Sequence, residues 1–353
     1  MIPANRRRSR EIKIGNVVVG GNRPISVQSM TNTDTRDVDS TVKQIRRLEE
    51  VGCELIRVAV VDQEAAEALS KIKEQINIPL IADIHFDYRL ALQAMENGID
   101  GLRINPGNIG NKAKVRQVTA MAKDKGIPIR IGVNAGSLEK ELLRKHGGVT
   151  PQALVESALG HASILEDLDF QAIKISLKAS HVPLMVEAYR LLAAQTDYPL
   201  HLGVTEAGTL LVSSVKSSMG IGLLLSEGIG DTIRVSITGD PVWEVKVGFE
   251  ILKSLGLRER GIELISCPTC GRCQIDLVHL AEEVEKRLAF VNKPLKVAVM
   301  GCPVNGPGEA RQADVGIAGG KGLGLVFRHG EIVAKVPQKE LIESLVREVE
   351  KMV

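Results

Sequence analysis

A repeating pattern of apolar and polar positions runs through the first 240 residues. A short β-branched run is followed by a polar or glycine-containing turn, and then by a stretch such as VDSTVKQIRRLEEVG (38–52). Apolar residues recur in these stretches at three- and four-residue spacing, which predicts amphipathic helices. The runs predicted to be strands are 25–30, 55–60, 80–85, 101–107, 129–136, 173–180, 201–208 and 233–240. Eight strand-then-helix units in about 240 residues have the size and order of a TIM (β/α)8 barrel, an α/β fold.

The pattern changes after about residue 258. A cysteine-rich segment is followed by a predicted helix (274–290), a strand (295–300), a glycine-rich loop, a second strand (314–319), a hairpin (323–336) and a final helix (338–353). We therefore expect a barrel domain of residues 1–258 and an α+β domain of residues 259–353. A doubly wound open sheet is the alternative fold, but no GxGxxG follows an early strand.

Two short segments precede the first predicted barrel strand. IKIGNVVVGGN (12–22) predicts a hairpin that plugs the barrel floor. RRRSR (6–10) is expected to form a solvated arm.

Five predicted barrel strands carry a cation between two apolar residues. The cations are Arg57, Arg103, Arg130, Lys174 and Arg234. Strand side chains alternate between faces, so if the apolar neighbours pack under the helices, the cations point into the barrel. Unpaired buried cations cost several kcal/mol each, so they need anions. Pairing with Asp83, Glu206 and Asp240 is one explanation, but five cations in register favour a phosphate or diphosphate pocket.

Other polar residues follow the same strands. Asn134 and Ser236 share the face of the cations and are candidate substrate contacts. Asp83, His85 and Glu206 fall near the carboxyl ends of strands three and seven, where the chemistry of TIM barrels takes place. They are therefore candidate acid-base groups.

The cysteines point to a metal centre. ISCPTCGRC contains Cys267, Cys270 and Cys273 at CxxC spacing, and GCPVNGPGE contains Cys302. The C-x2-C-x2-C run and the later Cys-Pro pair favour iron-sulfur ligation over structural zinc, because a zinc ribbon normally has a second CxxC pair. Unligated reactive thiols are the third possibility. Cys53, alone near a barrel strand, is expected to be a core residue.

Composition narrows the function further. The 45 basic residues nearly balance the 43 acidic ones, so no overall field favours nucleic acid or membranes. Nine aromatic residues are too few for base-stacking platforms. No apolar run approaches the ~18 residues that span a bilayer, and the start has no apolar segment of a signal peptide. We expect a soluble cytoplasmic protein that binds neither nucleic acid nor membranes.

The motifs together resemble one enzyme family. ISCPTCGR, GCPVNGPGE, VQSMT, ADIHFDYRLA, RINPGN, GVNAGSL and VTEAG are similar to those of the 4-hydroxy-3-methylbut-2-enyl diphosphate synthases of the methylerythritol phosphate isoprenoid pathway. The resemblance covers essentially the whole chain. It implies an N-terminal TIM barrel joined to a C-terminal domain like a module of sulfite and nitrite reductases, with one four-iron four-sulfur cluster per chain.

The resemblance also implies a site and a reaction. The cluster ligands would be Cys267, Cys270, Cys302 and the carboxylate of Glu309, while Cys273 goes beyond the ligand set of the family. Glu309 could leave the cluster and open one iron site. The substrate would be 2-C-methyl-D-erythritol 2,4-cyclodiphosphate, reductively opened and dehydrated by two electrons to the linear allylic diphosphate. Asn305 could contact this substrate, and Glu206 could move protons.

Partners follow from the same resemblance. Electrons would come from a flavodoxin or ferredoxin, since the sequence has no nicotinamide fingerprint. The family forms homodimers in which the cluster of one chain caps the barrel of the other. The alternative function is a zinc-stabilised TIM-barrel aldolase or condensing enzyme that acts on a phosphorylated substrate.

Overall fold

The computed structural model describes residues 6–302, 313–320 and 322–353. Clustering of contacts divides the chain into two compact units, Met1–Arg258 and Glu259–Val353. No helix among the described residues is both long and apolar enough to cross a membrane.

The first unit is a parallel barrel, which confirms the fold expected from the repeating pattern. Its strands are β3 (Ser26–Met30), β4 (Leu55–Ala59), β5 (Leu80–Asp83), β6 (Gly101–Ile104), β7 (Ile129–Asn134), β8 (Ile173–Lys178), β9 (His201–Leu202) and β10 (Thr232–Ile233). They neighbour one another in the order β8-β7-β6-β5-β4-β3-β10-β9. One parallel bridge, between Ile175 and Leu200, joins β8 to β9 and nearly closes the barrel.

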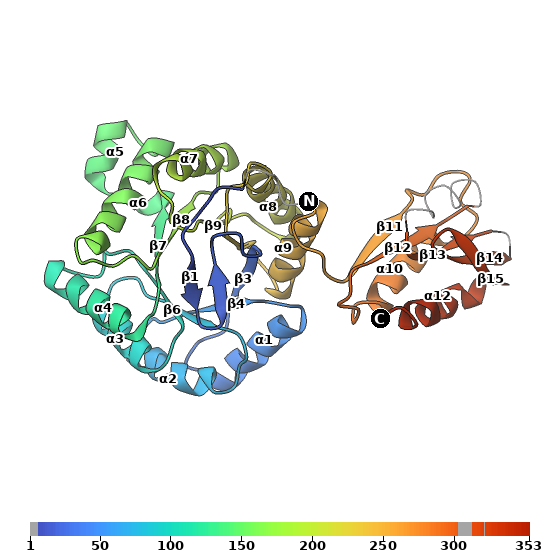
Figure 1. The fold of residues 1–353 in the computed structure, drawn as a ribbon, viewed down its shortest axis with the longest axis horizontal. Helices are drawn as coiled ribbons and strands as arrows, with labels where there is room; N and C mark the ends of the chain where they lie inside the picture. Colours follow the sequence, from blue (N-terminus) through green and yellow to red (C-terminus); the bar gives the residue numbers. More distant parts are fainter. Residues whose placement is uncertain (1–5, 303–312, 321) are drawn as a thin grey trace. The chain divides into compact units, whose positions relative to one another are not determined.

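Helices surround these strands (Figure 1). They are α1 (Val38–Glu50), α2 (Gln63–Lys73), α3 (Tyr88–Glu96), α4 (Lys112–Lys125), α5 (Lys140–His146), α6 (Pro151–Glu166), α7 (Val182–Gln195), α8 (Leu210–Ser226) and α9 (Val242–Ser254), with a short 3-10 turn, η1 (Ala135–Ser137). Polar side chains accept hydrogen bonds from the first turns of six helices and so fix where those helices begin. These caps are Asp37, Asp62, Asp87, Asn111, Thr150 and His181.

Strands β9 and β10 are much shorter than the runs expected for them, because the chain leaves the ladder early at Gly203. A Cβ atom at Gly203 would lie 2.6 Å from the carbonyl oxygen of Arg234. Only glycine allows this close approach of two backbones. The residues after both strands, including Glu206 and Ser236, therefore belong to loops.

A hairpin closes one end of the barrel, as the sequence predicted. Strands β1 (Ile12–Ile14) and β2 (Val17–Val19) pair antiparallel. Ile12, Ile14 and Val19 form a buried cluster with Leu55 and Ile81, which stand at or near the starts of β4 and β5. The hairpin thus packs an apolar floor against the amino-terminal ends of the strands. In Figure 1 the hairpin lies within the ring of helices.

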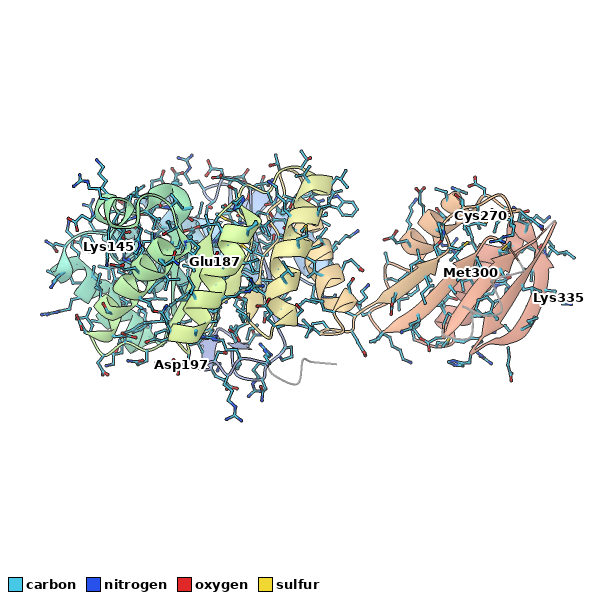
Figure 2. All side chains as sticks on the ribbon, turned by 90° about the horizontal axis from the view of Figure 1, so that it is seen from above. Lys145, Glu187, Asp197, Cys270, Met300 and Lys335 are labelled. Carbon is cyan, nitrogen blue, oxygen red and sulfur yellow. The ribbon has the colours of Figure 1, made fainter. Side chains whose placement is uncertain are left out.

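The expectation of a solvated arm at residues 6–10 is wrong. Arg6 Nη2 lies 3.3 Å from Asp231 Oδ1, and Ser9 Oγ donates to the same oxygen at 2.7 Å. Arg7 Nη2 donates to the carbonyl oxygen of Tyr198 at 2.8 Å. The physical reason is Asp231, a buried carboxylate before β10 that needs hydrogen-bond donors. Arg10 continues this docking in an ion pair at 2.6 Å with Asp197, which Figure 2 labels.

The second unit is a mixed sheet with helices on one face. Its elements are β11 (Ile262–Ser266), α10 (Leu277–Arg287), β12 (Leu295–Met300), β13 (Val315–Gly319), β14 (Leu323–Arg328), β15 (Glu331–Pro337), η3 (Gln338–Glu340) and α12 (Leu341–Glu350). Strands β11, β12 and β13 run parallel, and β13, β14 and β15 form an antiparallel meander. Residues of α10 and α12 bury one face, while Ala298, Met300 and Phe327 belong to a smaller separate cluster. The likeness to a sulfite or nitrite reductase module stays a prediction.

Candidate active site

Four ionisable residues form a row across neighbouring barrel strands. Asp83 of β5 lies in register with Arg103 of β6, Arg103 with Arg130 of β7, and Arg130 with Lys174 of β8. All four side chains are at least 95% buried. Their apolar neighbours along each strand belong to the large core beneath the helices, so the row occupies the barrel interior. The predicted inward direction of these cations agrees with this arrangement.

Asp83 holds two of the cations. Its Oδ1 accepts from Arg103 Nη1 at 2.9 Å, and its Oδ2 lies 3.4 Å from Arg57 Nε. Burial alone would raise the pKa of Asp83, but Arg57, Arg103 and Arg130 together outweigh burial and hold that pKa far below its usual value. Asp83 is therefore a fixed negative charge.

Backbone geometry fixes the guanidinium of Arg103. Its Nη2 donates to the carbonyl oxygen of Gly132 at 2.9 Å. A Cβ atom at Gly132 would lie 2.6 Å from Arg103 Nε, so only a residue without a side chain leaves room for this guanidinium. Asn105 Oδ1 accepts from the N–H of Gly132 at 3.0 Å and so supports the same part of β7.

Arg234 has a partner that the sequence did not suggest. Its Nη2 and Nε lie 2.8 and 3.1 Å from the two carboxylate oxygens of Glu244, which is buried at the start of α9. Glu244 also accepts from Ser29 Oγ at 2.8 Å. Asp240, one of the carboxylates that the sequence offers as partners inside the barrel, instead pairs with the exposed Arg47.

Some donors of the buried cations lack hydrogen-bond partners among the described residues. The three guanidinium nitrogens of Arg130, Nζ of Lys174 and Nη1 of Arg57 are buried without a hydrogen-bond partner among the described residues. Burial, reinforced by neighbouring cations, lowers the pKa values of Arg130 and Lys174 well below their usual range. Burial also lowers the pKa of Arg57, to about 10. The barrel interior thus has donors and positive charge that a polyanion could satisfy.

A cavity opens beside this row, and it contains a cation that sequence reasoning missed. The cavity is lined by Arg57, Lys178, His201, Gly203, Val204, Thr205, Arg234 and Ser236. Lys178 ends β8, and burial lowers the pKa of its ammonium well below the usual value. A signal for it existed, because Lys174, Ser176 and Lys178 alternate along one strand and so share a face.

The other predicted site residues lie at the ends of the same strands. His85 is exposed after β5, with its Nε2 3.0 Å from Arg103 Nη1. Burial lowers the pKa of His85, and the charge of Asp83 opposes that shift. Asn134 ends β7 half-buried, and Ser236 lines the cavity. Glu206 is exposed and has a left-handed backbone (φ 51°), which is uncommon for a residue with a side chain.

The cysteines gather at one end of the second unit's sheet. Cys267 directly follows β11, and Cys302 follows β12, its parallel neighbour. The loop that carries Cys270 and Cys273 is tied to the segment before Cys302, since Gln274 N donates to the carbonyl oxygen of Gly301 at 3.0 Å. A Cβ atom on Gly301 would lie only 2.5 Å from Cys273 Sγ. In Figure 2, Cys270 stands at the rim of this unit and Met300 lies inside it.

The thiols suit a metal, although the described residues do not form a closed metal site. All five cysteines are free, and the backbone N–H of Arg272 lowers the pKa of the exposed Cys270. Within residues 6–302, 313–320 and 322–353, no three His, Cys, Asp or Glu side chains converge on one point. Glu309 and Asn305 lie outside the described residues. Cys53 is buried in the barrel core, as expected, and burial raises its pKa to about 12.

Comparison with known proteins covers both units. A family model described as the GcpE TIM-barrel domain matches residues 9–249, and one described as the GcpE protein C-terminal domain matches residues 263–351. A relative from Geobacter sulfurreducens is 65% identical over 345 residues, 98% of each chain. A relative from Clostridium perfringens is 63% identical over 346 residues, 98% of this chain and 99% of the relative. Both are named 4-hydroxy-3-methylbut-2-en-1-yl diphosphate synthase (flavodoxin).

Solved structures show a fold likeness only. Dihydropteroate synthase from Stenotrophomonas maltophilia superposes with a TM-score of 0.52 at 13% identity, over 70% of this chain and 97% of that enzyme.

The imbalance of charge predicts opposite effects of two similar substitutions. Arg130→Met removes an unpaired cation and should raise the free energy of unfolding of the ligand-free barrel by about 1 to 4 kcal/mol. Arg234→Met leaves the buried Glu244 carboxylate without its partner and should lower the free energy of unfolding by about 3 to 5 kcal/mol. Urea denaturation without phosphate, followed by fluorescence of the single tryptophan, Trp243 in α9, measures both. Equal destabilisation by the two variants would contradict this view of the barrel.

Proposed function

Because this chain belongs to the GcpE family, we propose that it forms 4-hydroxy-3-methylbut-2-enyl diphosphate from 2-C-methyl-D-erythritol 2,4-cyclodiphosphate. In this reaction the cyclic diphosphate opens at a carbon–oxygen bond, a hydroxyl leaves as water, and two electrons and two protons enter. The observation that carries the proposal is the set of buried cationic donors without partners among the described residues, above all those of Arg130 and Lys174. A diphosphate supplies the oxygens and the negative charge that these groups lack.

The cations differ in how they hold the diphosphate. Arg130 and Lys174 have no carboxylate hydrogen-bonded to them, so their donors are free for phosphate oxygens. Arg57 and Arg103 are braced by Asp83, and Arg234 by Glu244, so each presents its guanidinium in a fixed direction. Such fixed donors stabilise charge that develops on the departing oxygen without reorganising. Lys178 and Ser236 add polar groups to the cavity, and Asn134 stands half-buried at the end of β7.

Proton transfer falls to groups at the carboxyl end of the barrel. Asp83 stays ionised beside its arginines, so we assign it the positioning of Arg57 and Arg103 rather than proton donation. Glu206 is exposed after β9, beside the cavity residues Val204 and Thr205, and is our candidate proton donor. His85 contacts Arg103 and is a second candidate. The unusual backbone of Glu206 supports a functional role, because such strain concentrates at active sites.

The second unit would hold one four-iron four-sulfur cluster. The thiols of Cys267 and Cys302 follow adjacent parallel strands, and the loop of Cys270 is tied to the same segment, so the chain fits such a group. Glu309 as fourth ligand and Asn305 as substrate contact stay predictions. When bound, the cluster would supply single electrons and an iron that can bind an oxygen atom of the substrate. Flavodoxin is the electron donor we propose, as in the names of the relatives, with ferredoxin as the alternative.

A homodimer with shared active sites fits the surface of the barrel. Helix α8 exposes Leu211, Val215 and Met219 at four-residue spacing, together with Val212 and Leu223. Lys216 is the one charged residue of this helix. An apolar surface of this kind suits a second copy of the chain better than a charged partner. A cytoplasmic location stays a prediction.

Anaerobic purification followed by iron, sulfide and zinc analysis tests the proposed cofactor. We expect about four irons per chain and reductive conversion of the cyclodiphosphate with reduced flavodoxin. Cys302→Ser should lose the iron, because a ligand is removed, whereas Cys53→Ser should retain it as a matched control in the barrel core. Stoichiometric zinc in a colourless protein would instead indicate the barrel aldolase or condensing enzyme.

Mixing two inactive variants tests the shared site. Arg130→Ala disables the barrel, and Cys302→Ala disables the cluster unit. If one chain's cluster serves the other chain's barrel, each heterodimer regains one of its two sites. Random subunit exchange makes about half of the dimers heterodimers, so activity should return to about a quarter of the wild-type level. No regained activity after subunit exchange, verified with differently tagged chains, would show that each chain forms its site alone.

A further inference from the structure

His201 is a titratable group in the cavity that the roles above do not use. It begins β9 and is 3% exposed. Its ring lines the same cavity as Arg57, Lys178 and Arg234. Its Nδ1 lies 2.8 Å from Oγ1 of Thr232, the residue in register with it on β10.

Cations surround this ring. Lys174 and Lys178 approach from β8, Arg130 from β7 and Arg57 from β4. Arg234 shares the cavity from β10, where it is paired with Glu244. Asp231, which precedes β10, is engaged by the N-terminal arm, and Asp83 by Arg57 and Arg103. Burial, reinforced by these cations, lowers the pKa of His201 well below its usual value, so the ring is neutral when no anion is present.

The contact with Thr232 holds the ring in either charge state. In the Nε2–H tautomer of the neutral ring, the threonine hydroxyl donates to Nδ1. In the charged ring Nδ1–H donates to the hydroxyl oxygen, because a hydroxyl is both donor and acceptor. In both states Nε2 keeps its proton, and no hydrogen bond from Nε2 to another described residue is found. Nε2–H is thus free to donate to a ligand in the cavity.

We propose that His201 is a ligand-contacting residue that takes up a proton when a diphosphate binds and donates from Nε2 to a phosphate oxygen. Burial and the surrounding cations both oppose a charged imidazole; the ligand's negative charge offsets the cations and pairs directly with the charged ring, which favours protonation. The proton comes from solvent, and no electrons move. This inference rests on the proposed function, since it needs a diphosphate in this cavity.

The coupling has a definite sign. The ring binds its proton more tightly in the complex than in the free protein, so binding consumes protons. The affinity therefore falls as the pH rises through the interval between the two pKa values of His201. Within that interval the contribution of His201 is at most about tenfold in affinity per pH unit.

Calorimetric titration of the holoenzyme with inorganic diphosphate tests this inference. Titrations in buffers of different ionisation enthalpy count the protons taken up per bound ligand. His201→Gln keeps a donor but cannot be charged, and it should take up fewer protons than the wild type, by up to about one. His146→Gln, on α5 and outside the cavity, is the matched control and should equal the wild type. The ligand's own ionisation contributes equally to all three proteins and cancels in the difference.

The outcomes separate the two claims. Equal proton uptake by wild type and His201→Gln, with diphosphate bound to both, overturns the role of His201 and leaves the proposed diphosphate site intact. Absence of binding to the wild type overturns both. If His201→Gln does not fold, ring-nitrogen NMR of the wild type shows whether a histidine ring becomes charged when diphosphate binds. One of the seven histidines must change from neutral to charged on addition of diphosphate at constant pH, and no such change refutes the role.

Discussion

Buried positive charge without enough negative charge to match it is the constraint on which the rest of this structure depends. Arg57, Arg103, Arg130, Lys174, Lys178 and Arg234 surround the barrel interior, while Asp83 and Glu244 are the carboxylates bonded to them. Filling the interior with branched apolar side chains, as in most barrels, would be more stable. In the function that we propose, a diphosphate would complete this interior, as expected when function is favoured over stability.

The surrounding structure offsets the free-energy cost of burying these charges. Outward residues of each strand pack into one continuous core beneath the helices, and that core supplies the hydrophobic stabilisation. The β1–β2 hairpin closes the amino-terminal end with apolar side chains. Gly132 and Gly203 provide room where a side chain would collide with Arg103 or with the backbone of Arg234. The N-terminal arm supplies hydrogen-bond donors to Asp231, whose charge acts on Lys174 only from a distance.

Much of the barrel and its charged lining could be predicted from the sequence, because strand alternation places every second residue on one face. The apolar-cation-apolar triplets around Arg103, Arg130 and Lys174 follow directly from that alternation. Lys178 could have been found by extending the same alternation along β8. The role of Glu244 could not have been predicted, because Glu244 lies on a helix. The spacing of helical residues does not indicate which strand residue each of them contacts. The prediction of a solvated N-terminal arm was wrong for a related reason. A run of arginines suggests exposure to solvent until the buried carboxylate that binds it, Asp231, is known.

The second unit shows what cysteine spacing can and cannot predict. The CxxC spacing indicates a metal site at once, and adjacency of β11 and β12 explains why distant cysteines gather at one sheet end. The spacing alone does not separate ligands from Cys273, which also lies against this segment.

The affinity of the unreduced protein for the cyclodiphosphate tests the central claim most directly, because binding is measured without turnover. Arg103→Ala and Arg130→Ala should each weaken binding by about tenfold or more, which corresponds to at least about 1.4 kcal/mol. Arg190→Ala, an exposed arginine of α7 paired with Glu227, should bind like the wild type. Unchanged affinity in the two barrel variants would contradict the account of the barrel as a diphosphate site.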